Sequence, residues 1–104
     1  MFIHVSRDYA VALEEPQEFK RFNLAVDAPQ SDRAQLVEAL TGVASLSEDG
    51  HAWVSEAWLR ARDPAPQWQE GLTAMIVVAK KYGWVDEAAK AIRAHIEWRG
   101  DKAS

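Results

Sequence analysis

The chain has 104 residues, enough for one domain with a single hydrophobic core. Apolar residues make up 48% of the sequence and charged residues 27%, a balance typical of folded rather than disordered proteins. The absence of cysteine excludes disulfides, thiolate metal sites and cysteine nucleophiles. We expect one domain over residues 1–104, with residues 101–104 frayed.

The formal net charge of −4 is divided unevenly along the chain. Residues 1–50 carry nine acidic and four basic side chains, whereas residues 51–104 carry seven and eight. Neither half has a basic stripe, so we expect no binding to nucleic acid or to a membrane surface. The start does not resemble a signal peptide, and the longest apolar run, residues 74–79, is too short to span a bilayer. These features predict a soluble, cytoplasmic protein.

The first part of the chain predicts strands. Ile3 and Val5 alternate with polar neighbours, which indicates a short strand over residues 2–5. Residues 9–13 are apolar but fit no single pattern. Between residues 19 and 26 apolar side chains alternate again, which predicts a second strand there.

A short helix is expected after this strand and a loop. Asp32 suits the N-cap of the helix, and Gln35 lies three residues further on, where it would complete a capping box. Gly42 suits the end of the helix, because glycine adopts a positive φ without steric strain.

Residues 43–61 predict a hairpin followed by a second short helix. The apolar runs 43–46 and 51–54 flank an Asp-Gly pair, which is a strong turn signal. Ser55 then suits the N-cap of a helix over residues 56–61.

The clearest helical pattern covers residues 67–82, where apolar side chains recur at spacings of three and four. Gly83 suits the residue just past its end, and Trp84 is expected to pack back onto Ala79 as in a Schellman motif. Because residues 74–79 are apolar nearly all round the helix, we expect it to be central in the domain or shared with a second subunit. The predicted core face contains Leu72, Ile76 and Ala79.

The C-terminal segment fits two patterns. Residues 85–96 present an apolar face at helical spacing with Asp86 as a cap, whereas residues 92–98 alternate as in a strand. We expect a helical turn from Asp86 that runs into a closing strand near residues 92–98. The order of elements predicts an α+β fold, in which a small, mostly antiparallel sheet is covered on one face by two to three helices.

Candidate catalytic residues are few. His95 and Glu97 share a face if their segment is a strand, and His4 lies on the polar side of the first predicted strand. If those strands are neighbours, His4, His95 and Glu97 converge and could act as a general acid and base. The alternative is that the histidines are unrelated surface residues. No spaced set of metal ligands is present, and we expect neither a metal nor another cofactor.

All five tryptophans follow residue 50. Tryptophan combines a large apolar area with a polar N–H, which suits pockets and interfaces. Two of the five fit the helical packing pattern, but Trp53, Trp58 and Trp98 do not. We expect these three, together with Arg93, to line a ligand site or an interface; the alternative is that they build the core.

Two functional hypotheses follow from these patterns. The first is a binding module that forms a homodimer or docks a protein partner through its tryptophan-rich C-terminal half. The second is a small-molecule-binding protein or enzyme with a His/Glu site beside tryptophans, although the sequence assigns no reaction. A concave pocket with a histidine would favour the second hypothesis, and a flat apolar patch would favour the first.

Overall fold

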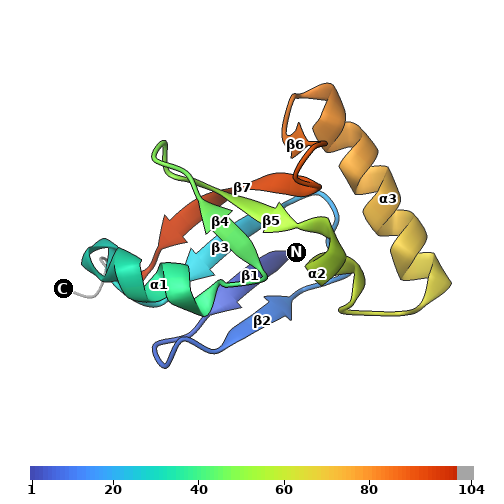
Figure 1. The fold of residues 1–104 in the computed structure, drawn as a ribbon. Coiled ribbons are helices and arrows are strands. Elements are labelled where there is room, and N and C mark those ends of the chain that lie inside the picture. Colours follow the sequence, from blue (N-terminus) through green and yellow to red (C-terminus); the bar gives the residue numbers. More distant parts are fainter. Residues whose placement is uncertain (101–104) are drawn as a thin grey trace.

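A computed structural model describes residues 1–100, and the expectation of frayed residues 101–104 lies outside this range. A curled sheet forms the centre of the molecule, and α3 lies at one end of it (Figure 1). The elements in chain order are β1 (Phe2–Val5), β2 (Val11–Glu14), β3 (Asn23–Val26), the 3-10 turn η1 (Gln30–Asp32), α1 (Arg33–Ala39), β4 (Ala44–Leu46), β5 (His51–Ser55), α2 (Glu56–Arg60), α3 (Pro66–Lys81), β6 (Val85–Asp86) and β7 (Ala91–Trp98).

The sheet is mixed, so the predicted mostly antiparallel sheet is wrong, although helices beside a sheet agree with an α+β class. Its strand order is β2-β1-β3-β7-β5-β4, and β6 pairs with β7 outside this path. The pairs β1–β3 and β3–β7 are parallel. The β1–β2 hairpin returns the chain to the end where β1 began, and β3 starts from that end, so it runs in the direction of β1. The sheet curls into a half-barrel rather than lying flat under a layer of helices (Figure 1).

The hydrophobic core lies against one face of the sheet. Alternate residues of each long strand point into it because successive side chains of a strand face opposite ways. Helix α1 adds Leu36, with Leu40 just after its end, and α2 adds Leu59. Fully buried strand residues of this core are Ile3, Val5, Leu24, Val26, Ala52 and Val54. The polar residues that alternate with them therefore share the other face of the sheet.

Several local predictions are confirmed by hydrogen bonds and backbone angles. The hairpin forms between β4 and β5, and the Ser55 hydroxyl accepts a hydrogen bond from the Trp58 N–H at 3.2 Å, which caps α2. Gly83 has a φ of 76°, and the Trp84 N–H donates to the Ala79 carbonyl at 3.0 Å, as expected for a Schellman ending of α3. Gly42 also has a positive φ.

Other local predictions are wrong. The Asp32 side chain makes no capping bond to α1 and instead accepts a hydrogen bond from the Tyr9 hydroxyl at 3.1 Å. The strand expected between residues 19 and 26 begins only at Asn23, since residues 19–22 lead into the sheet as a loop. Asp86 itself belongs to β6, but residues 87–90 after it form a turn, and the Asp86 carboxylate accepts a hydrogen bond from the Ala89 N–H at 3.1 Å, so the expected cap is confirmed although no helix follows. The closing strand β7 is confirmed over its whole predicted length.

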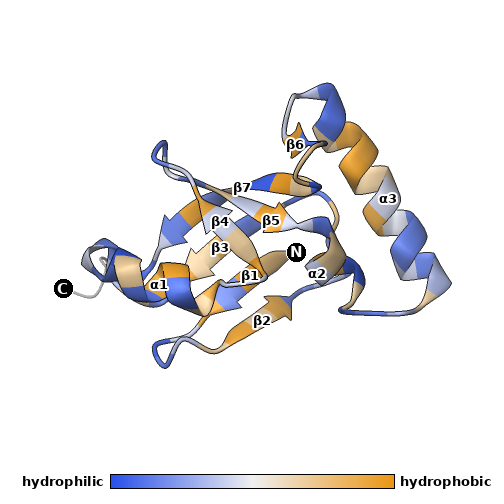
Figure 2. Cartoon of the chain, in the orientation of Figure 1, coloured by the Kyte–Doolittle hydropathy of each residue, from blue (hydrophilic) through white to orange (hydrophobic). Residues whose placement is uncertain are grey.

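Helix α3 is peripheral rather than central. Its apolar residues are prominent on the hydropathy-coloured ribbon (Figure 2), yet only Trp68, Leu72 and Ala79 are buried. Ile76 is partly buried, and Val77 and Val78 are 50% and 51% exposed. The wide apolar surface of this helix is therefore not explained by burial in the core.

We expect Leu72→Ala to lower the free energy of unfolding by about 2–5 kcal/mol, because Leu72 is fully buried and its loss leaves a cavity. Val77→Ala, on the same helix but half exposed, should cost about 0.5 kcal/mol or less. Urea unfolding of both variants measures the difference. Equal losses would contradict the assignment of the buried face of α3.

Candidate functional site

The candidate site lies where β7 changes its neighbour along one edge. β6 pairs with residues 91–92 of β7, and β3 pairs with residues 95–98. Between these two pairings, the N–H of Arg93 donates to the carbonyl of Trp84 at 2.8 Å. The chain that leads into β3, residues 19–22, and the chain that leads from α3 into β6 diverge at this point. A groove lies between them, under α3.

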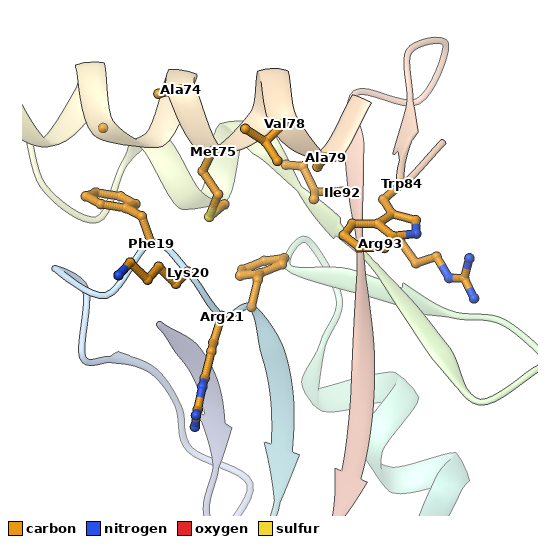
Figure 3. A pocket seen from close by; sticks show the side chains of 12 residues that line it. Phe19, Lys20, Arg21, Ala74, Met75, Val78, Ala79, Trp84, Ile92 and Arg93 are labelled. Carbon is orange, nitrogen blue, oxygen red and sulfur yellow. The ribbon is translucent and has the colours of Figure 1, made fainter. Parts of the chain in front are cut away.

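The groove has a volume of about 540 Å³, and its walls are mostly apolar. Met75 and Val78 extend from α3 toward the chain below, and Phe19 lies beneath the same helix (Figure 3). Phe22, Trp84 and Ile92 also line the groove. Its lining residues, as described within 1–100, include three basic side chains and no acidic one; the basic ones are Lys20, Arg21 and Arg93.

A glycine in α3 allows the groove to form in this shape. A Cβ atom added to Gly71 would lie 2.5 Å from Cε2 of the Phe19 ring, which is too close for any real contact. The missing side chain therefore lets Phe19 pack directly beneath the helix. On the neighbouring turn of α3, the indole N–H of Trp68 donates to the carbonyl of Pro16 at 2.8 Å and ties the helix to the chain that precedes residue 19.

A smaller hollow of about 220 Å³ adjoins the groove. It is lined by His51 and His95, and it shares Phe22, Trp84 and Arg93 with the groove. His51 and His95 are cross-strand partners on β5 and β7, and their ring centroids are 5.9 Å apart in an edge-on arrangement. An apolar groove thus continues into a hollow of nitrogen-bearing side chains.

Hydrogen bonds orient the ring of His51. The Asp49 carboxylate lies 3.2 Å from its Nδ1, and Nη2 of Arg93 lies 2.9 Å from its Nε2. The same Nη2 also lies 3.2 Å from Nδ1, so the guanidinium contacts both ring nitrogens of His51. The pKa of Asp49 is lowered, first by a hydrogen bond from the Ser47 hydroxyl and then by the contact with His51.

The structure separates His4 from the other two candidate catalytic residues. His4 pairs in register with Ala25, which in turn pairs with Glu97, so His4 and Glu97 lie two strand spacings apart, about 9.5 Å. His4 contacts two other carboxylates: Nε2 lies 2.8 Å from Asp27, and Nδ1 lies 3.3 Å from Glu14. His95 lies beside His51 instead.

The three tryptophans singled out by sequence occupy different places. Trp53 is half-buried on β5, opposite Arg93 of β7, while Trp58 and Trp98 pack partly buried against the core. The Arg62 guanidinium lies 4.3 Å from the Trp58 ring centre, a cation–π contact. None of the three lines the groove or the hollow.

Of the residues that line this site, sequence reasoning singled out only Arg93 and His95, and it missed the others, among them Phe22, His51 and Trp84. No local motif marks them, because they come together only through the β5–β7 register and the change of neighbour along β7. Trp84 was assigned to the end of its helix on the basis of spacing. Trp84 is nevertheless 43% exposed, and its indole stacks on Tyr82 with ring centroids 4.8 Å apart.

Within residues 1–100, no group of three or more histidine, aspartate or glutamate side chains is arranged to hold a metal ion. In the same range no helix is long and apolar enough to cross a membrane. Models of known protein families do not match this chain, and no curated protein or solved structure is significantly similar to it.

We expect Ser47→Ala to raise the pKa of Asp49, because the hydroxyl hydrogen bond stabilises the ionised carboxylate. NMR titration of the Asp49 carboxyl carbon measures the shift. Asp8 is a matched control, since the pKa of its carboxyl is lowered by an equivalent bond from Ser6 and should not change. A lowered pKa of Asp49 that persists in Ser47→Ala would assign the effect to His51 instead.

Proposed function

We propose that this chain binds a small molecule whose apolar body occupies the groove between α3 and residues 19–22. The observation that carries the proposal is the groove itself, with its volume of about 540 Å³ and its apolar walls. Sites for small molecules typically measure about 300–1,000 Å³ and combine apolar walls with a few polar groups. The groove and the adjoining hollow have this combination.

Two hydrogen bonds at the ends of α3 favour a groove that is already formed in the absence of a ligand. The Trp68–Pro16 hydrogen bond fixes one end of α3, and the Schellman bond from Trp84 to Ala79 fixes the other. A preformed site spends little of its binding energy on ordering the protein. The walls are therefore suited to binding an apolar body without a large rearrangement.

The geometry of His51 favours binding over acid–base catalysis. A general base needs a free lone pair on the nitrogen that faces the substrate. In this site both ring nitrogens of His51 are engaged: Nη2 of Arg93 lies 2.9 Å from Nε2 and 3.2 Å from Nδ1, and Nδ1 also faces Asp49. The contacts among Asp49, His51 and Arg93 therefore favour a role in positioning Arg93 over a role as a catalytic dyad.

We expect a neutral apolar fluorophore, N-phenyl-1-naphthylamine, to bind in the groove with enhanced emission. Val78→Trp should weaken this binding about tenfold or more, because a bulky side chain there fills the space between α3 and Phe22. Val77→Trp is the matched control, since Val77 is equally exposed on the same helix but does not line the groove. Absence of binding, or equal losses in the two variants, would contradict the proposal.

A second candidate function is self-association through the outer side of α3. The half-exposed Val77 and the 65% exposed Tyr82 favour it, because exposed apolar groups on one helix are typical of contact surfaces. The C-terminal half is close to neutral and could approach a second copy with little repulsion. Two-fold dimers are the commonest assemblies of identical chains.

If α3 forms such a dimer, sedimentation equilibrium should give twice the chain mass of 11.7 kDa. Val77→Asp should restore the monomer, because it places a charge in the contact. Val37→Asp, at a valine of α1 that is 48% exposed, should leave the dimer intact. A wild-type protein that stays monomeric throughout the micromolar range would exclude this second function.

A further inference from the structure

We propose that the small molecule bound in the groove is an amphipathic organic acid, whose single carboxylate is held by Arg93 beside His51 and His95. This inference rests on the proposed small-molecule function and adds the chemistry of the polar end. An apolar ligand body in the groove would place its end group at the adjoining hollow, because the two spaces share Phe22, Trp84 and Arg93.

Arg93 is positioned to reach both spaces. It lies on β7 at the residue where the strand changes its neighbour, and its backbone N–H is bonded to Trp84. Its side chain extends away from α3, past the indole of Trp84 (Figure 3). Nη2 of the guanidinium contacts the His51 ring. This contact uses only one of the three nitrogens through which arginine donates hydrogen bonds.

The charge around Arg93 favours an anionic ligand. None of the ion pairs formed among residues 1–100 involves Arg93. Arg93 acts on Asp49 only as the smallest of the influences that lower the pKa of that carboxyl, and its guanidinium can still bind a ligand carboxylate through two parallel N–H groups. Lys20 and Arg21 also line the groove and add positive potential near its opening.

Asp49 limits the negative charge that a ligand can carry in this hollow. Its carboxylate lies 3.2 Å from Nδ1 of His51, a nitrogen that Nη2 of Arg93 also approaches to 3.2 Å. A phosphate monoester carries about −1.5 to −2 charges at neutral pH and would be repelled by Asp49 more strongly than a monoanion. The balance of Arg93 against Asp49 therefore fits a carboxylate better than a phosphate.

The experiment compares two ligands of nearly the same shape, 1-naphthaleneacetic acid and its neutral amide, by isothermal titration calorimetry. We expect the dissociation constant of the acid to be lower than that of the amide by a factor of about ten or more. A charge-assisted hydrogen bond has an effect of this size. Arg93→Met should abolish this preference and leave the affinity for the amide within twofold. Arg7→Met is the matched control and should keep the preference for the acid, because Arg7 is exposed and lines neither the groove nor the hollow.

A salt series on the wild-type protein provides a readout that needs no variant. The affinity for the acid should fall as sodium chloride is raised, and the affinity for the amide should not. Equal affinities for acid and amide, while the neutral fluorophore still binds, would overturn this inference and leave the proposed function standing. Failure of all three molecules to bind would overturn both. Tighter binding of 1-naphthyl phosphate than of the acid would replace the carboxylate with a phosphate and also refute the inference.

Discussion

The pairing of β7 on both of its edges is the constraint on which the rest of the structure depends. One edge pairs with β5, and the other pairs first with β6 and then with β3. This strand is the longest in the sheet and brings the N-terminal and C-terminal halves of the chain together. Because β6 and β3 meet the same edge from different directions, the sheet opens where they part, and α3 lies over that opening.

The same arrangement explains why apolar and polar groups meet in one site. Residues of β7 alternate between the core and the opposite face, so Ile92 is buried while Arg93 and His95 face the hollow. Of the apolar side chains of α3 that the core does not fully bury, Ala74, Met75 and Val78 line the groove. Exposed apolar surface on a helix is typical of a site that binds something, which is the physical basis of both proposed functions.

Local elements of this fold were predictable wherever a few neighbouring residues determine the geometry. Three features appear as expected: the cap at Ser55, the cap at Gly83 and the hairpin between β4 and β5. Each depends on residues that are close together in the sequence. The expected cap at Asp32 failed because Tyr9, which is distant in sequence, binds its carboxylate instead. The late start of β3 similarly reflects Phe19, which packs beneath α3 rather than in the sheet.

Helix α3, the alternation of β7 and the absence of thiol chemistry were predictable, since they follow from residue type and spacing alone. Strand direction and order were decided only by the tertiary structure, because alternation is the same in parallel and antiparallel strands. The strand register determines which residue lies beside His95. It pairs His51 with His95, and it leaves His4 two strands away from Glu97. The linear sequence does not show which side chains meet across strands. The histidines of the candidate site are such a pair.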